Sequence, residues 1–174
     1  MSDRPFEPRT GIVLLLDDLA PTVADARYDL GRYGPNEIEL HVTLLFPFVP
    51  RRAVGPSVVD RLRALFAEQR RPAFALARIE SFDGGVVYAA PDPDEQLTRL
   101  IGELTARYPE TPPYGGSHDW PVPHATLAYS DGDGAVRARV EPLLPVRCEP
   151  AHASLIEEFE PLRWRELEPL PFAR

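Results

Sequence analysis

The feature that most constrains this chain is a strand pattern that occurs twice, each time with the same two polar residues in an otherwise apolar segment. His41-Val42-Thr43 lies in a segment that alternates over residues 38–46, and His124-Ala125-Thr126 lies in a second strand-like segment, 122–129. Residues two positions apart on a strand point to the same face. Each histidine therefore shares a face with its threonine, while the middle residue points toward the core.

A longer pattern surrounds the two motifs. A buried strand at 11–16 and a helix from Pro21 to about residue 33 precede the first motif, and a strand at 86–90 and a helix precede the second. The two motifs are separated by about half the length of the chain. This repeat predicts two similar lobes, related by a pseudo-twofold axis, that face each other across a cleft.

Each remaining segment shows either the two-residue apolar spacing of a strand or the three- and four-residue apolar spacing of a helix. We expect Ser57 to cap one helix, Asp92 or Asp94 to cap another, and the Pro- and Gly-rich stretch 108–123 to be a loop. Further strands are predicted at 72–79, paired as a hairpin with 86–90, at 146–158 and at 164–172, and a further helix at 133 to about 143. The prediction is an α+β fold in which two lobes of mainly antiparallel sheet carry outer helices, within a single domain over residues 1–174.

The charge balance narrows the class of ligand. The 174 residues contain 19 Lys and Arg against 27 Asp and Glu, a net charge of −8. Proteins that bind long nucleic acids neutralise many phosphates and usually have a basic surface. We therefore expect a small phosphate ester or an RNA end as the ligand, no long nucleic acid as a partner, and a monomeric protein.

The cysteine count and the apolar pattern give little support to a disulfide-bonded, secreted or membrane protein. The single cysteine, Cys148, has no partner for a disulfide within the chain, and we interpret it as a small strand residue. The first residues lack the apolar run of a signal peptide, and no apolar stretch approaches the ~20 residues that span a bilayer. We expect a cytoplasmic protein without a membrane partner.

Two histidines paired with two threonines suit one type of reaction. A cyclic phosphodiester needs a base that deprotonates water and an acid that protonates the departing ribose oxygen. Two imidazoles of near-neutral pKa on opposite sides of a phosphate supply both. The threonine hydroxyls can donate to the non-bridging phosphate oxygens. We predict His41, Thr43, His124 and Thr126 as catalytic residues, with no metal and no cofactor.

A binuclear metal hydrolase is the natural competing interpretation. It requires Asp or Glu ligands beside the histidines. Glu39 shares a face with His41, and Asp119 is close to His124 in the sequence, but neither spacing matches a known ligand set.

The two motifs, in the context Leu40-His41-Val42-Thr43-Leu44 and Val122-Pro123-His124-Ala125-Thr126-Leu127, resemble those of the two-histidine phosphoesterase superfamily, in its 2′-5′ RNA ligase-like branch. The resemblance extends more weakly over nearly the whole chain. It implies a bilobal fold with the four motif residues lining a central cleft. It also implies activity on 2′,3′-cyclic or 2′-5′ phosphodiesters of nucleotides or RNA ends.

Substrate-binding residues are predicted from residue type and position. Arg51 and Arg52 follow the first motif and can contact phosphate, although a solvated loop explains them equally well. Aromatic side chains can stack on a base. The candidates for stacking are Phe46, Phe48, Tyr88, Trp120 and Tyr129.

Three functions share such a site. A hydrolase opens a cyclic phosphodiester, a reversible 2′-5′ RNA ligase uses the same groups on a different substrate geometry, and a binding module holds a nucleotide or RNA end without turnover. The motifs do not rank ligation against hydrolysis. They favour catalysis over binding alone, because binding does not require two imidazoles.

Overall fold

All the strands of the protein join into one sheet in the computed structural model, which describes residues 6–30, 38–116, 121–129 and 133–173. The order across this eight-stranded sheet is β6-β3-β4-β5-β2-β1-β7-β8, and every neighbouring pair is antiparallel. The strands are β1 (Thr10–Leu15), β2 (His41–Leu45), β3 (Phe74–Ser81), β4 (Val86–Asp92), β5 (Ala125–Tyr129), β6 (Val146–Cys148), β7 (His152–Glu160) and β8 (Arg163–Pro171).

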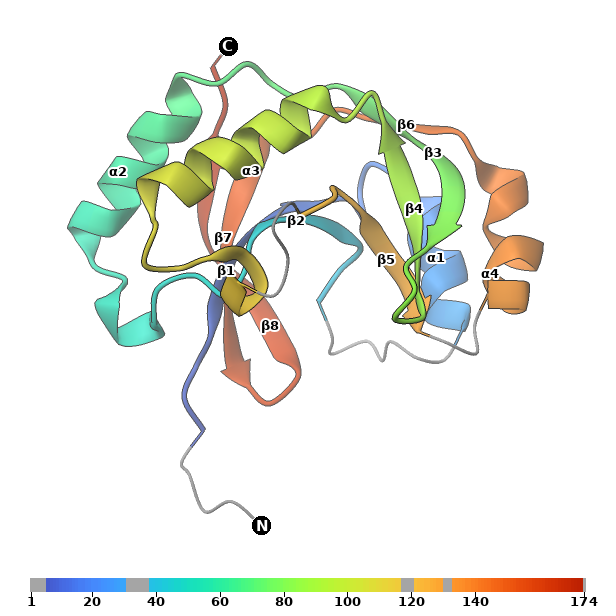
Figure 1. Cartoon of the computed structure of the whole chain (residues 1–174), viewed down its shortest axis with the longest axis horizontal. Helices are drawn as coiled ribbons and strands as arrows, with labels where there is room; N and C mark the ends of the chain where they lie inside the picture. The colour runs from blue at the N-terminus through green and yellow to red at the C-terminus, as the bar shows by residue number, and fades with distance from the viewer. Residues whose placement is uncertain (1–5, 31–37, 117–120, 130–132, 174) are drawn as a thin grey trace.

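The sheet consists of two halves that meet at β2 and β5. The β2 half contains β2, β1, β7 and β8, and the β5 half contains β5, β4, β3 and β6. In each half the innermost strand carries a motif, and its neighbour is the strand that precedes the motif strand in the sequence. The predicted antiparallel lobes are therefore confirmed, and they are continuous with each other through the central strand pair (Figure 1).

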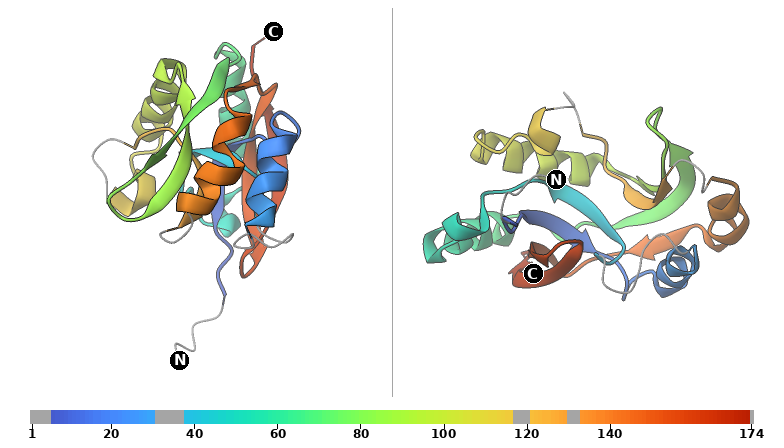
Figure 2. Two further views of the ribbon diagram at one scale, coloured as in Figure 1. Left: turned by 90° about the vertical axis from the view of Figure 1, so that its right-hand side faces the viewer. Right: turned by 90° about the horizontal axis from the view of Figure 1, so that it is seen from below.

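The α-helices are α1 (Pro21–Asp29), α2 (Pro56–Ala67), α3 (Glu95–Arg107) and α4 (Asp133–Arg139). They lie at the two ends of the molecule, α2 and α3 at one end and α1 and α4 at the other (Figures 1 and 2). The α3 helix follows β4 in the sequence but packs on β2, so it covers the opposite half of the sheet. An ion pair of 3.6 Å between Asp29 and Arg139 joins α1 to α4. No helix of the described residues is long and apolar enough to cross a membrane.

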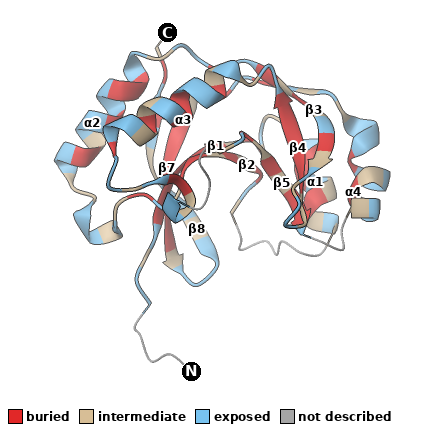
Figure 3. Ribbon diagram, in the orientation of Figure 1, coloured by how far each residue is buried: buried red, intermediate tan, exposed pale blue. Residues whose placement is uncertain are grey.

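The α2 and α3 helices are amphipathic, and their apolar stripes form part of the core with the sheet (Figure 3). Buried side chains of α2 and α3 recur at the three- and four-residue spacing that places them on one helix face. They are Val58, Leu62, Leu65 and Phe66 on α2, and Leu97, Leu100, Ile101 and Leu104 on α3.

Some predicted boundaries were wrong. Ser57 does not cap α2: the cap is Gly55, and Pro56 occupies the first turn, where its missing N–H leaves no helical hydrogen bond unmade. Asp94 is the cap residue of α3, without a side-chain hydrogen bond. The single strand predicted over 146–158 is two strands, β6 and β7, which lie far apart in the sheet order. The predicted helix from 133 divides into α4 and a short 3₁₀ turn, Glu141–Leu143.

The packing of α3 makes a testable prediction about stability. Leu100 is 1% exposed in the core. Its replacement by Ala removes buried methyl groups and leaves a cavity, which should lower the free energy of unfolding by about 2–5 kcal/mol in urea titrations. Thr98 is exposed on the same helix, and Thr98→Ala should change this free energy by no more than about 0.5 kcal/mol. Equal losses in both variants would contradict this packing.

Candidate active site

The pairing of β2 with β5 brings the two motifs together. Val42 lies opposite Ala125 in the antiparallel register. Continued by one residue in each direction, this register places His41 opposite Thr126 and Thr43 opposite His124. Directly opposed residues of antiparallel strands project to the same face, with Cα atoms about 4.5–5.5 Å apart. All four predicted catalytic side chains thus lie together on one face of the sheet, on both sides of a local twofold axis.

Each motif is followed by an irregularity of the ladder. The register between β1 and β2 skips Leu44, and the register between β4 and β5 skips Leu127. Such bulges bend a strand, increase its twist and are frequent beside active sites. The two bulges occupy equivalent positions, one residue after each motif threonine, so the pseudo-symmetry of the halves extends to the backbone of the site.

The two imidazole rings are held by equivalent hydrogen bonds. The Nδ1 atom of His41 lies 2.7 Å from the carbonyl oxygen of Glu39, and the Nδ1 atom of His124 lies 2.7 Å from the carbonyl oxygen of Val122. A carbonyl oxygen only accepts, so Nδ1 carries the hydrogen in both rings. In the neutral form, Nε2 of each ring is then the atom that accepts a proton.

The electrostatic surroundings of His41 favour its neutral form. Burial is the largest effect and, together with the positive charges of Arg27 and His124, lowers the pKa of His41 from 6.5 to about 4, against the smaller opposing effect of the Glu39 carbonyl. The effect of His124 on this pKa also places the two rings within electrostatic range of each other. At neutral pH, His41 is therefore ready to accept a proton.

Thr43 has a partner that the sequence analysis missed. Its hydroxyl hydrogen-bonds to the phenol oxygen of Tyr114, whose pKa is raised by burial, with Thr43 acting in the opposite direction. Tyr114 lies in the 3₁₀ turn Pro113–Gly116, and its backbone N–H donates to the carbonyl oxygen of Phe46 at 2.7 Å. Its φ of 52° is in the left-handed region, which is uncommon for a tyrosine. An aromatic residue between Pro-Pro and Gly-Gly, within a predicted loop, was the available signal.

Aromatic rings enclose His124. The centroid of Phe82 lies 5.0 Å and that of Tyr88 5.4 Å from the His124 ring, both in edge-to-face arrangements. Phe82 and Tyr88 stack on each other at 4.3 Å, and the Tyr88 hydroxyl donates to Glu80 at 2.9 Å. Burial and this hydrogen bond raise the pKa of Tyr88 to about 12. The ring of Tyr88, predicted as a stacking candidate, thus packs on the His124 imidazole, as does that of Phe82, which the sequence analysis did not identify.

The segment that leads into β2 is held by Asp17. Its carboxylate accepts a hydrogen bond from the backbone N–H of Leu40 at 2.7 Å and another from the hydroxyl of Tyr28 at 2.8 Å. The backbone N–H of Leu16 also donates to the carbonyl oxygen of Leu40 at 2.8 Å. These bonds attach the residues just before His41 to the end of β1 and to α1.

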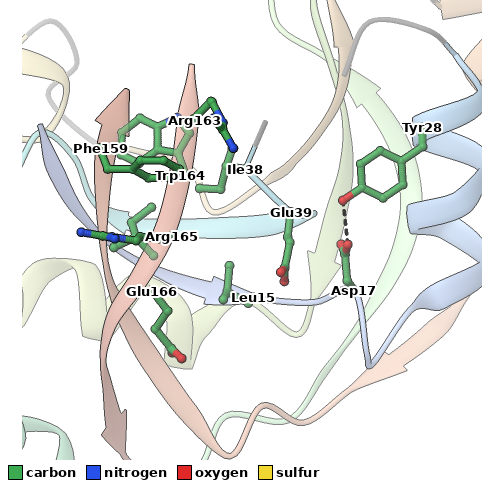
Figure 4. Close-up of a pocket in the computed structure, with 11 residues that line it drawn as sticks. Leu15, Asp17, Tyr28, Ile38, Glu39, Phe159, Arg163, Trp164, Arg165 and Glu166 are labelled. Carbon is green, nitrogen blue, oxygen red and sulfur yellow. Dashed lines mark hydrogen bonds between the residues drawn. The ribbon is translucent and has the colours of Figure 1, made fainter. Parts of the chain in front are cut away.

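A cavity of about 340 Å³, shown in Figure 4, is lined by residues that neighbour His41. Leu15, which lines it, is the register partner of His41, and Glu39, which also lines it, holds the His41 ring through its carbonyl. Its complete lining is Leu15, Asp17, Tyr28, Ile38, Glu39, Ile156, Phe159, Arg163, Trp164, Arg165 and Glu166.

Phe46 lies just after β2, close to this cavity. Its ring packs edge-to-face on Trp164 at 5.8 Å, and the guanidinium of Arg9 lies 5.4 Å from the Phe46 centroid and 5.7 Å from that of Trp164. Gly11 allows this position, because a Cβ atom there would lie 3.0 Å from Cδ2 of Phe46. Phe48 is different: it is buried in the core against Tyr108.

Arg51 and Arg52 both form ion pairs within the protein. Arg51 donates to the buried carboxylate of Glu157, which also pairs with Arg165 at 2.5 Å, and Arg52 pairs with Glu7. Their contact with substrate stays a prediction, and these partners supply a structural role for each.

The other two substrate-binding candidates are Tyr129 and Trp120. Tyr129, at the end of β5, is 48% exposed. Trp120 lies outside the described residues.

Of the two carboxylates considered for the alternative, metal-dependent interpretation, the structure describes one. Glu39 is beside His41, whereas Asp119 lies outside the described residues. In the described part of the chain, no three His, Cys, Asp or Glu side chains are grouped so as to hold a metal ion. Cys148 is buried in β6, and burial raises the pKa of its thiol to about 11, in keeping with its interpretation as a strand residue.

Comparison with known proteins identifies the family. The profile of the 2′-5′ RNA ligase superfamily matches residues 15–164, and the chain belongs to this superfamily. This confirms the resemblance to two-histidine phosphoesterases. No curated protein sequence matches the chain.

Solved structures share the fold over nearly the whole chain. TT0787 of Thermus thermophilus is 18% identical with a TM-score of 0.66, covering 94% of this chain and 97% of its own. E. coli LigT complexed with 3′-AMP is 16% identical with a TM-score of 0.64, covering 97% and 100%. E. coli LigT complexed with NADP⁺ is 17% identical with a TM-score of 0.60, covering 98% and 100%.

The lowered pKa of His41 predicts how stability depends on pH. Between about pH 6.5 and 4 the unfolded chain binds a proton at this histidine that the folded protein does not, so the free energy of unfolding falls as the pH falls through this window. His41→Gln removes this contribution. In urea titrations at pH 7 and pH 5, the variant should lose less stability between the two pH values than the original protein. An equal loss in both proteins would contradict the environment assigned to His41.

Proposed function

We propose that the protein is a metal-independent phosphoesterase that hydrolyses 2′,3′-cyclic phosphodiesters, or related 2′-5′ phosphodiesters, of nucleotides or RNA ends. The observation that carries the proposal is the pair of imidazoles on one face of the sheet, each with its Nδ1 held by a backbone carbonyl, which makes Nε2 the atom that exchanges the proton. Such a pair supplies an acid and a base to one substrate without a metal.

The local twofold axis suits an in-line displacement at phosphorus. In that transition state the entering and leaving oxygens lie on opposite sides of the phosphorus atom. A phosphate on the axis between His41 and His124 would present one of these oxygens to each ring. The bond from the water oxygen to phosphorus forms while the bond from phosphorus to a ribose oxygen breaks. One imidazole accepts the water proton, and the other, protonated, donates a proton to the departing ribose oxygen.

The asymmetry of the surroundings suggests which histidine takes which role. His41 is kept neutral by burial and by the charge of Arg27, which suits the base that activates water. His124 is then the acid, with its ring position fixed by Phe82 and Tyr88. With only one of the two imidazoles protonated, there is also no repulsion between two positively charged rings.

The threonines complete the site in this proposal. Thr43 and Thr126, on the same face as the histidines, would donate to the non-bridging phosphate oxygens and stabilise their negative charge in the transition state. The Tyr114 hydroxyl, by donating to the Thr43 oxygen, would hold this side chain before substrate arrives and leave the Thr43 hydrogen for the phosphate. Tyr114 is a positioning residue in this scheme.

The structures of LigT support a small phosphate ester as ligand. LigT of E. coli has been crystallised with 3′-AMP, NADP⁺, ATP and phosphate, all of them small phosphate-bearing molecules or phosphate itself. With the 5′-hydroxyl of a second RNA in place of water, the same groups would form a bond from that oxygen to phosphorus while the bond from phosphorus to the 3′-oxygen breaks. This joins two RNA ends through a 2′-5′ bond, so ligation is the second candidate function.

Single replacements test the catalytic pair. His41→Ala and His124→Ala should each lower the turnover of nucleoside 2′,3′-cyclic phosphates by about 10²–10⁴-fold, because each removes one proton-transfer group. The double variant should lose little more than the worse single variant, since both rings serve one step. His152→Ala, outside the motifs, is the matched control and should retain turnover. Release of the nucleoside 2′- or 3′-phosphate is measured by chromatography.

Three results would count against parts of the proposal. Full turnover in the double variant would exclude two-histidine catalysis. Loss of turnover in EDTA with recovery in zinc would favour the metal-dependent alternative. Binding of product without turnover of any cyclic or 2′-5′ substrate would favour the binding module.

A further inference from the structure

The cavity beside His41 has walls suited to a flat, hydroxyl-bearing molecule. Trp164 and Phe159, from β8 and β7, stand on one side, and Tyr28, from α1, stands on the other (Figure 4). Leu15 and Ile156 add apolar surface between them. Ligand pockets typically combine apolar and aromatic walls with a few placed polar groups, and a volume of about 300 Å³ is at the small end of their range. This cavity therefore suits a group of about the size of one nucleoside.

Three carboxylates supply the cavity with acceptors of hydrogen bonds. Asp17, Glu39 and Glu166 line it with carboxylates. Asp17 already accepts from Tyr28 and Leu40, and Glu166 accepts from Ser154 at 2.6 Å. In the described part of the chain, no side chain hydrogen-bonds to the Glu39 carboxylate. Glu39 is therefore the acceptor that remains for ribose hydroxyls or base amino groups.

The two arginines of the cavity pair with carboxylates that do not line it, and Arg165 shares its partner with Arg51. Arg163 donates to Glu160 at 2.7 Å, and Arg165 pairs with Glu157 at 2.5 Å. The carboxylates also affect one another: burial, followed by the charges of Asp17, Asp18 and Glu166, raises the pKa of Glu39. An anionic group of a ligand inside this cavity would be repelled by the same carboxylates.

From this cavity we infer that the enzyme binds the nucleoside of its substrate beside His41, and that Glu39 selects nucleosides without a 5′-phosphate. The inference rests on the proposed function and narrows its substrate class. The carboxylates line the same cavity that would hold the nucleoside, and charges closer together than about 8 Å are incompletely screened at physiological salt. A 5′-phosphate would be repelled. Since the terminal nucleoside of an RNA carries a 5′-phosphodiester, the preferred substrates are free nucleoside 2′,3′-cyclic phosphates rather than RNA ends.

Product binding tests the inference without requiring turnover. Isothermal titration calorimetry compares adenosine 2′-phosphate with adenosine 2′,5′-bisphosphate, which differ only in the 5′-phosphate. The protein should bind the monophosphate about 10–100-fold more tightly, because like charges placed together weaken binding strongly. Glu39→Gln keeps the size of the side chain and removes its charge, and it should reduce this ratio at least threefold, chiefly through tighter binding of the bisphosphate.

Glu68→Gln, which removes one negative charge from the end of α2, is the matched control and should leave the ratio unchanged. Equal or tighter binding of the bisphosphate by the original protein, an equal change of the ratio in both variants, or no binding of either ligand would overturn the inference. Failure of the proposed function is recognised separately, because it appears as absent turnover of 2′,3′-cyclic phosphates whatever the binding ratio.

Discussion

The antiparallel contact between β2 and β5, centred on Val42 and Ala125, is the interaction on which the rest of the structure depends. It joins two four-stranded halves into one sheet, and it determines how the two motifs meet. In this register each histidine lies opposite the threonine of the other motif. A shift by one residue would turn one motif toward the core, because side chains alternate between the two faces. The apolar middle residues, both fully buried, hold the register against such a shift.

The pseudo-twofold symmetry places two imidazoles in equivalent positions, and their surroundings make them different. Both rings bond through Nδ1 to the carbonyl two residues earlier, and both motifs precede a bulge. Around His41 the sheet leaves a cavity and Arg27 contributes a positive charge, whereas around His124 two aromatic rings fill the space. In the proposed mechanism this difference assigns the two roles, with the base on one side of the phosphate and the acid on the other.

The sequence was sufficient for the parts of the site that depend on local periodicity. Alternation predicted that His41 and Thr43 share a face, and the repeated strand-helix-strand order predicted two similar halves. Contacts between distant segments were not predictable in this way. Nothing near Arg51 in the sequence indicated its pairing with Glu157, more than a hundred residues away. Tyr114 and Phe82 reach the site only because a loop and a hairpin fold back on it. The split of 146–158 into two distant strands likewise reflects topology, since β6 pairs with β3 whereas β7 pairs with β1 and β8.

The central claim is that the two histidines act on one phosphate, one as base and the other as acid. The pH dependence of kcat/KM for a nucleoside 2′,3′-cyclic phosphate tests this most directly, because its two limbs report the groups that must be deprotonated and protonated in the free enzyme. The account predicts a bell-shaped profile whose acid limb disappears in His41→Ala and whose basic limb disappears in His124→Ala. A bell of unchanged shape in either variant would contradict it.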